Sequence, residues 1–482
     1  MTTHRTEQSD VDESESPVAA FDRLTRVDVP ERTPVLFDTA CVLGGSVAGL
    51  LAARVLADHA RTVLIIERDG VNVEGRPRAG VPQDRQGHGL LPGGLAQIER
   101  WLPGFTREAQ YLCGVSVGPD QQALYLDGHP QVRSRDARIL LGSRPFLESR
   151  IRSRVLALPN VSTLSAQATG LEYRGDAVSA VRYVADGVED VTSVDFVVDA
   201  MGRASRLSEW VEQAGYDRPR LQRLRTGINY ATALFERSDK PDDLDLACAL
   251  AQFTPSSSPD GVAVGGVNAV EGDQWLVMLM AYGDDQPFRS IEAFRSTCAT
   301  MPPIFGEAVT GAVTRDILTY HQADSRRRDF AGLSRFPARL VSVGDAVASF
   351  NPVYGQGISS AALHASCLSD YLVGDPALDM PAAEFFALQE VVVDAAWTVS
   401  AGGDAARLDA LDGAEVPEAV RRQRWAMDQL VRATLVDEAV ANAFNRVAFM
   451  LAHPFSLGDS ALVEQAAAAN RRASARSRTA GS

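Results

Sequence analysis

The most informative stretch of the chain is Val341-Ser-Val-Gly-Asp-Ala-Val-Ala-Ser-Phe-Asn-Pro-Val-Tyr-Gly-Gln-Gly-Ile358. An apolar, strand-like run ends in Gly344 and Asp345, and a turn rich in Asn, Pro and Gly follows. A helix of small residues then begins at Ile358. The pattern predicts a strand, a polar loop and a helix N-terminus, whose free N–H groups can face an anion or an electron-rich ring edge.

A second glycine-rich unit lies between Phe37 and Glu67. Residues 39–43 and 61–66 are apolar enough to predict two buried strands, and residues 50–59 predict the helix that joins them. This strand–helix–strand order, with a glycine-rich turn and an acidic residue at the end of the second strand, is typical of dinucleotide binding.

Each position of that turn has a physical reason. In Gly44-Gly-Ser-Val-Ala-Gly49, Gly44 permits a tight turn, and the small Ser46 lets the main chain approach a pyrophosphate. Gly49 permits close packing of helix and strand, and Glu67 can accept hydrogen bonds from ribose hydroxyls. Ser46 stands where the strict pattern has its middle glycine.

The two units together resemble the FAD fingerprints of flavoprotein monooxygenases built like para-hydroxybenzoate hydroxylase. The first unit opens the chain and the Gly-Asp…Pro…Gly-x-Gly motif lies far downstream, which in that family is the arrangement for FAD rather than NAD. The resemblance implies an α/β fold, with a Rossmann-like (GR2-type) FAD-binding domain, an inserted mixed β-sheet substrate domain and a C-terminal helical region. It also implies FAD as cofactor and NADPH or NADH as reductant.

The segment Val81-Pro-Gln-Asp-Arg-Gln-Gly-His88 is similar to one found in a bacterial subgroup of these flavoproteins, which includes the epoxidases of polyether-antibiotic pathways. The resemblance implies that Arg85 contacts the FAD phosphates or ribityl chain. The subgroup often carries His-x-His here, and Gln86 replaces the first of these histidines. The alternative is that Arg85 and His88 only pin a loop.

Two further segments follow the family's order. Arg144 matches its arginine segment, at the start of a helix for which Ser143 is the expected N-cap. Asp199 opens an Asp-Ala-x-Gly-x-x-Ser segment in which Met201 replaces the usual threonine. The FAD contacts that the resemblance implies are Gly44, Ser46, Gly49, Glu67, Arg68, Arg85, Arg144, Ala168, Asp199, Gly344, Asp345, Pro352, Gly355 and Gly357. The sequence names no catalytic residue and no metal ligands.

Pattern and composition divide the chain into five parts. The predicted parts are a disordered leader (1–36), an FAD-binding domain (37–220 and 318–375), a β-rich substrate domain (221–317), a C-terminal helical region (376–470) and a frayed tail (471–482).

Charge and cysteine content exclude several classes of protein. The 47 basic and 62 acidic residues leave a net charge of −15, which argues against nucleic acid or an anionic membrane as partner. The five cysteines are scattered without a CxxC pair, which fits a reducing compartment and argues against disulfides or a zinc site. We see no signal peptide and no apolar run near the ~18 residues that a membrane helix needs, so we expect a cytoplasmic protein without membrane insertion.

The resemblance implies a reaction in which one oxygen atom from O2 enters a hydrophobic small molecule, by hydroxylation or epoxidation. An Arg- and Ala-rich, Lys-poor composition suggests bacterial secondary metabolism. Two alternatives stay open: reduction of a polyene or prenyl substrate, and a non-catalytic partner protein, for which Ser46, Gln86 and Met201 are the support. Halogenation is disfavoured, because Lys240 is the only lysine and no Trp-x-Trp-x-x-Pro segment is present.

Overall fold

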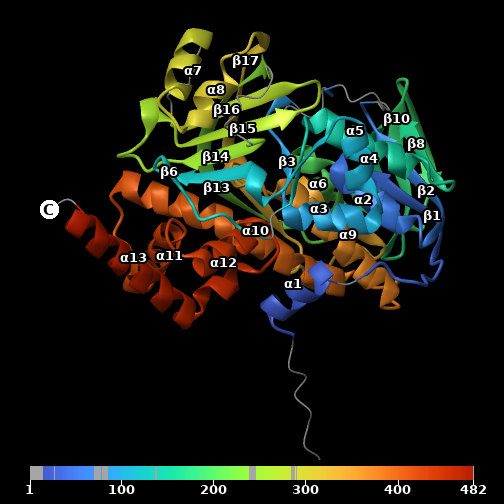
Figure 1. Cartoon of the computed structure of the whole chain (residues 1–482). Coiled ribbons are helices and arrows are strands. Elements are labelled where there is room, and N and C mark those ends of the chain that lie inside the picture. The colour runs from blue at the N-terminus through green and yellow to red at the C-terminus, as the bar shows by residue number, and fades with distance from the viewer. Residues whose placement is uncertain are drawn as a thin grey trace, which may run out of the picture.

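The computed structural model describes residues 15–26, 28–69, 77–78, 85–135, 138–237, 246–283, 288 and 290–480. A parallel sheet with flanking helices lies beside a larger mixed sheet, and the C-terminal helices pack along the latter (Figure 1). The leader residues 1–14, the segment 81–84 and Lys240 lie outside the described residues.

The parallel sheet contains the first glycine-rich unit. Its five strands, in spatial order, are β18 (Leu340–Ser342), β12 (Phe196–Asp199), β1 (Phe37–Leu43), β2 (Ala60–Glu67) and β8 (Val161–Ser165). All neighbours pair in parallel, so their carboxyl ends meet at one edge, which is where such sheets bind ligands. The central strands are almost continuously apolar because helices cover both faces of a parallel sheet.

Helices position this edge. Helix α2 (Val47–Leu56) follows β1, and α9 (Gly357–Val373) packs against α2, α3 (Pro92–Trp101) and α10 (Ala383–Asp412). The predicted Rossmann-like α/β architecture is therefore confirmed. Among the described residues, the first two thirds of the chain also contain α4 (Phe105–Tyr111), α5 (Arg144–Leu156), α6 (Leu207–Gln213), α7 (Ile291–Cys298) and α8 (Pro303–Ala308).

The predicted mixed sheet is also present, with eight strands. Their order is β19 (Ala348–Ser349), β17 (Val313–Asp329), β13 (Arg220–Glu236), β16 (Gln274–Tyr282), β15 (Val264–Val270), β14 (Cys248–Gln252), β5 (Gln122–Leu126) and β6 (His129–Pro130). Three of these strands lie outside the predicted limits 221–317, and β17 runs through the limit at 317. The limits are wrong for the sheet because strand pairing recruits distant segments that local pattern does not reveal.

Two smaller sheets also lie among the described residues. One contains β9 (Gln167–Arg174), β10 (Ala177–Ala185) and β11 (Val188–Ser193). The other contains β3 (Gly89–Leu90), β7 (Ile139–Leu141) and β4 (Val115–Val117).

The N-terminal leader needs a correction. Residues Pro17–Arg26 form helix α1, in which Phe21 and Leu24 are buried. Arg23 also pairs with Asp370 of α9 at 2.7 Å. A short polar segment can therefore be ordered, because a few apolar side chains on one helical face add to the main core.

The C-terminal helical region is confirmed, with α10, α11 (Glu418–Ala433), α12 (Glu438–Ala448) and α13 (Ser460–Ala480). The predicted frayed tail is wrong for residues 471–480, because α13 continues to Ala480. Within the described residues, no helix combines the length and the apolar character needed to cross a bilayer.

Candidate cofactor and substrate site

The turn between β1 and α2 requires glycine at two positions. Gly44 has φ +105°, and a Cβ atom there would lie 2.5 Å from the main-chain oxygen of Ala200. A Cβ atom at Gly49 would lie 1.9 Å from the main-chain oxygen of Gly44. Both glycines are explained by close main-chain packing, which brings the α2 N-terminus against the edge of the sheet.

Glu67, at the end of β2, is held from two sides. Its Oε2 accepts the Gly45 N–H at 2.6 Å and its Oε1 accepts the Asp69 N–H at 3.0 Å. Arg78 donates to the same Oε2 at 3.2 Å. The carboxylate is fixed at the rim of the central cavity described below.

A buried charge cluster supports this turn, and the sequence analysis missed it. Glu148 of α5 pairs with Arg152 at 2.5 Å and with Arg78 at 2.6 Å, and it accepts the Ser46 hydroxyl at 2.8 Å. Burial alone would raise the pKa of Glu148, but the charges of Arg78, Arg144 and Arg152 hold it below its usual value. The available signal was an acidic residue four positions after Arg144 and four before Arg152, which places all three on one face of a helix.

Arg144 lies where the prediction needs it. It is the first residue of α5, and the predicted N-cap is confirmed, because the Ser143 hydroxyl accepts the Phe146 N–H at 3.3 Å. One Arg144 nitrogen lies 3.3 Å from the Ser46 hydroxyl, at the N-terminus of α2. A guanidinium and a helix N-terminus thus face the same space, which favours an anion there.

The second glycine turn forms the opposite wall. Gly344 has φ +62°, and a Cβ atom there would lie 2.5 Å from the Cβ of Ala48 in α2. The Gly344 N–H donates to Nδ1 of buried His364 at 2.9 Å. Asp345 makes no hydrogen bond within the part of the chain that the structure describes, and its carboxyl lines the cavity. Burial raises its pKa, against the opposing effect of Arg144 and Arg203.

The chain then turns into α9. Asn351 accepts the Val353 N–H at 3.1 Å, and Gly355 has φ +67°. A Cβ atom at Gly357 would meet nothing within 4 Å. The α9 N-terminus therefore borders open space rather than packed side chains.

Asp199 supports the cavity without lining it. It is fully buried and accepts the Ser205 hydroxyl at 2.6 Å and the Met201 N–H at 3.0 Å. Burial raises its pKa. These bonds hold the turn at Gly202, whose φ is +69°. Because the Met201 main chain makes the contact, this turn does not need the usual threonine.

The prediction for Arg85 is not supported. Its side chain is exposed and does not line the cavity, and its main-chain oxygen accepts a bond from Arg315 at 2.8 Å. Arg78, which lies shortly before Arg85 in the sequence, has the buried position between Glu67 and Glu148 instead. Sequence alone could not decide which loop arginine turns inward.

Gln86 connects the segment before β3 to the mixed sheet, and His88 bonds to the Gln86 main chain. Gln86 accepts the Thr232 hydroxyl of β13 at 2.5 Å. Nδ1 of His88 lies 2.9 Å from the Gln86 main-chain oxygen, so it must carry the proton, which leaves Nε2 as an acceptor. Burial, and then Arg144, lower the pKa of His88 to about 3. Both side chains line the cavity.

Several other basic side chains near the cavity pair with groups of the protein itself. Arg203 lines the cavity but pairs with Asp324 at 2.7 Å, and Arg206 pairs with Glu209 at 3.0 Å. The run 326–328 bonds to Asp324, Glu390, Asp394 and the Ala346 main chain. These contacts favour a structural role for the run.

All these elements surround one central cavity of about 670 Å³. Its far end is the face of the mixed sheet, where Tyr230 and Tyr320 lie opposite each other on β13 and β17 and Met278 lies on β16. Of the predicted contacts, those that line it are Gly44, Ser46, Glu67, Arg68, Arg144, Ala168, Gly344, Asp345, Pro352, Gly355 and Gly357. Gly49, Arg85 and Asp199 do not.

These residues fit FAD. The cavity offers an anion-favouring end at Ser46 and Arg144, a fixed carboxylate at Glu67, and an unpartnered carboxyl at Asp345 among the described residues. The open space at Gly357 is where a planar ring could approach the main chain. No group of His, Cys, Asp and Glu among the described residues could hold a metal ion.

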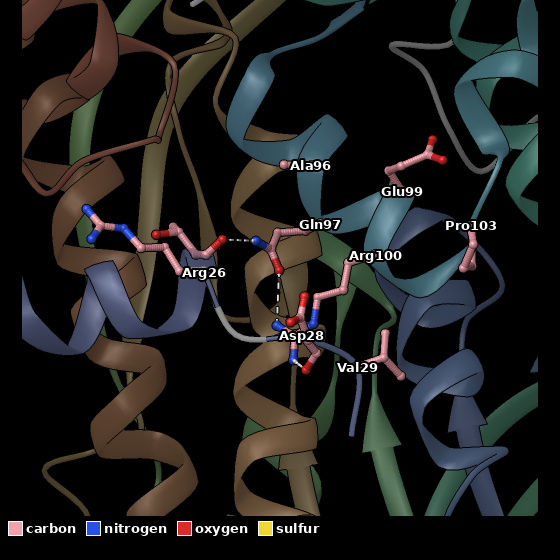
Figure 2. A pocket seen from close by; sticks show the side chains of 9 residues that line it. Arg26, Asp28, Val29, Ala96, Gln97, Glu99, Arg100 and Pro103 are labelled. Atoms are coloured by element: carbon pink, nitrogen blue, oxygen red, sulfur yellow. Dashed lines mark hydrogen bonds between the residues drawn. The ribbon is translucent and has the colours of Figure 1, made fainter. Parts of the chain in front are cut away.

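A second hollow, of about 480 Å³, lies between α1 and α3 (Figure 2). Its polar groups are used internally: Gln97 donates to the Thr25 main chain at 3.3 Å and Arg100 to that of Asp28 at 3.1 Å. These bonds attach the segment of α1 to α3, so the polar groups of the hollow have a structural role.

Solved structures of known proteins share this fold. A flavin-dependent brominase, Bmp2, matches with a TM-score of 0.62 at 14% identity, covering 90% of this chain and 99% of that chain. A p-nitrophenol 4-monooxygenase, PnpA from Pseudomonas putida DLL-E4, matches at 0.57 and 17%, covering 88% and 98%. A 2-methyl-3-hydroxypyridine-5-carboxylic acid oxygenase matches at 0.55 and 18%, covering 79% and 93%. The chain has the fold of para-hydroxybenzoate hydroxylase-like flavin monooxygenases.

A sequence relative places the chain more narrowly. Protein Rv3254 of Mycobacterium tuberculosis (strain ATCC 25618 / H37Rv) is 33% identical over an alignment of 348 residues that covers 69% of this chain and 72% of that protein. The chain belongs to the family of protein Rv3254. It matches no protein-family profile.

Proposed function

We propose that this protein is an FAD-dependent, NAD(P)H-using monooxygenase that inserts one oxygen atom from O2 into a hydrophobic small molecule. The observation that carries the proposal is the continuous central cavity, which joins a dinucleotide-type turn at one end to an aromatic and methionine-lined sheet face at the other. A cofactor and a substrate could therefore share one enclosed space, as this chemistry requires.

The residues that would hold FAD follow from the geometry. Arg144 and the α2 N-terminus, which begins beside Ser46, would bind the pyrophosphate, and Glu67 the ribose. Asp345 would accept a ribityl hydroxyl. The α9 N-terminus, at Gly357, carries positive partial charge toward the cavity and would favour negative charge on a reduced ring.

When bound, FAD supplies hydride uptake from NAD(P)H and reaction with O2. The chain's task is placement and exclusion of water. Met278 and Phe350 bring apolar surface to the cavity, and the rings of Tyr230 and Tyr320 add flat walls. An apolar, planar or polyene substrate suits these walls.

The lining residues do not choose between hydroxylation and epoxidation. Phenol hydroxylation usually benefits from a general base, whereas an alkene needs none. His88 leaves Nε2 unprotonated at the cavity, so an acceptor for a substrate hydroxyl is at hand. The likeness of 81–88 to polyether epoxidases makes alkene-bearing compounds of bacterial secondary metabolism equally suitable first substrates.

Oxygenation is favoured over halogenation, although a brominase shares the fold, because flavin halogenases of this fold use an early lysine and a Trp-x-Trp-x-x-Pro segment. The chain has only one lysine, Lys240, and it has no Trp-x-Trp-x-x-Pro segment.

The test is a purified protein with FAD. We expect a flavin absorption band that NADPH or NADH bleaches, O2 uptake in the presence of phenols or polyenes, and a product heavier by one oxygen atom. A product that gains two hydrogens would instead identify a reductase. Failure to bind FAD would identify a non-catalytic partner protein, and bromide incorporation would identify a halogenase.

A further inference from the structure

Helix α10 contacts the second glycine turn and the strand before it at three points along its length. Gln389 donates to the main-chain oxygen of Ser342, at the end of β18, at 2.8 Å. Three turns later, the hydroxyl of Ser400 accepts the N–H of Asn351 at 3.0 Å. Asp404, one turn further on, contacts the Asn351 side chain. One helical face thus follows the second glycine turn from the strand to the loop.

The Asn351 side chain makes three hydrogen bonds. Its Nδ2 donates to Asp404 Oδ1 at 2.9 Å and to the Tyr282 hydroxyl at 3.1 Å. Its Oδ1 accepts the Val353 N–H at 3.1 Å, which begins the turn that leads to Gly355 and α9. The orientation of the amide is therefore determined, because reversing it would set its NH2 group against the Val353 N–H and its oxygen against the Asp404 carboxylate.

Asp404 accepts a hydrogen bond from the Asn351 amide and so helps to fix the orientation of that amide. It is 1% exposed, and its second oxygen accepts the Thr226 hydroxyl of β13 at 3.4 Å. Arg407 lies 3.9 Å from the carboxylate, stacks on the Tyr282 ring at 4.0 Å and donates to the Thr226 main chain at 2.7 Å. The carboxylate thus joins a C-terminal helix, the mixed sheet and the loop beside the cavity.

We propose that Asp404 is a positioning residue that, acting through Asn351, holds the turn 351–357 in the shape that binds the ring end of the cofactor. The identity of the ligand rests on the proposed function, whereas the ordering of the turn does not. Asp404 itself does not line the cavity, so its effect passes through Asn351, which does.

Three variants test this. Asp404→Asn keeps the shape but removes the negative charge and replaces one acceptor oxygen by an amide N–H group, which would face either the Asn351 amide N–H or the Thr226 hydroxyl. Adding Asn351→Asp exchanges donor and acceptor and restores the pair, while the carboxylate introduced by that second substitution can still accept from the Val353 N–H and from the Tyr282 hydroxyl. Asp409→Asn is the control, since Asp409 lies on the same helix, pairs with Arg424 at 2.5 Å and does not line the cavity.

Two readouts separate a positioning role from general stability: amide hydrogen exchange at 351–358 in FAD-free protein, and the Kd for FAD from fluorescence titration. For Asp404→Asn we expect exchange to be about tenfold faster and the Kd about tenfold higher, as for loss of one hydrogen bond to a charged group. The double variant should return both to within about threefold. The control should change neither.

Unchanged exchange at 351–358 in Asp404→Asn, or no recovery in the double variant, would overturn the proposal. If the single variant does not fold, recovery of folded protein in the double variant supports it and failure of both overturns it. Absence of FAD binding in the unmodified protein would refute the proposed function alone, because the exchange measurement still decides the role of Asp404.

Discussion

Glu148 and Arg152 form a buried ion pair one turn apart on α5, with Oε1 and Nη2 at 2.5 Å, and the same Arg152 nitrogen donates to the Gly45 main-chain oxygen at 2.8 Å. The Glu148 carboxylate therefore holds the guanidinium groups of Arg78 and Arg152 next to the first glycine turn. Because Ser46 also donates to Glu148, the turn, the helix and the arginines form one unit.

Replacing Glu148 by Gln should destabilise the protein by about 3–5 kcal/mol, since removing one partner of a buried pair leaves uncompensated charge. Negative charge on a bound pyrophosphate would offset part of that loss, so FAD should stabilise the variant more than the unmodified protein. Urea unfolding with and without FAD measures both effects.

The control for this variant is Glu418→Gln. Glu418 forms the same i,i+4 pair with Arg422, at 2.9 Å, on the exposed surface. Exposed pairs contribute little, so we expect no measurable change. Equal effects of the two substitutions would contradict the role given to Glu148.

Gly357→Ala tests where the cofactor ring lies. The added Cβ would meet nothing within 4 Å, so FAD-free protein should keep its stability. If the ring occupies that space, the methyl group should raise the Kd for FAD at least about tenfold, which corresponds to about 1.4 kcal/mol. Fluorescence titration and thermal unfolding provide the two measurements.

Gly402→Ala is the matched control, because Gly402 is helical, exposed and also free of neighbours within 4 Å. Its FAD affinity should stay the same. An unchanged affinity in Gly357→Ala as well would place the ring elsewhere.

His364 should make the protein sensitive to acid. Its Nδ1 accepts the Gly344 N–H, so it is neutral, and burial lowers its pKa from 6.5 to about 3. Below pH 6.5, therefore, His364 binds a proton in the unfolded state but stays unprotonated in the folded state until the pH approaches 3. Its stabilising contribution is complete above pH 6.5 and is lost toward pH 3, by at most about 1.4 kcal/mol per pH unit.

His364→Asn retains an acceptor for Gly344 but cannot titrate. We expect the free energy of unfolding to depend less steeply on pH between 6.5 and 4.5 than in the unmodified protein. Buried carboxyl groups with a raised pKa, such as Asp199 and Asp345, act in the opposite direction, and Glu148, whose pKa is lowered, acts in the same direction. These groups are present in both proteins, so the difference between the two curves is the quantity to compare. Parallel curves would mean that His364 does not titrate on unfolding.

Helix α1 should contribute to stability, which a disordered leader would not do. Phe21 is fully buried and packs on the ring of His453 at 5.8 Å between centroids. Phe21→Ala should cost about 3–5 kcal/mol in urea unfolding. Val35→Ala, at a side chain that is 59% exposed, should leave stability unchanged. If Phe21→Ala left the free energy of unfolding unchanged, the interpretation of this segment as a disordered leader would stand.

The sequence was sufficient for features whose cause is local. The two glycine turns, the β1–α2–β2 unit and the Ser143 cap depend on φ angles, close main-chain packing and neighbours within a few residues. Such constraints appear directly as residue types at fixed spacing, which is why the α/β fold class and the two walls of the cavity could be predicted.

Tertiary structure alone decided which charged side chains turn inward. Arg78 rather than Arg85 meets Glu148, and Asp404 meets Asn351 across 53 residues of chain. Buried charges are held by partners that supply hydrogen bonds in space, and nothing in the local pattern identifies those partners. The same reason explains the packing of α1 and the strands recruited into the mixed sheet: long-range burial, not local propensity, offsets their ordering cost.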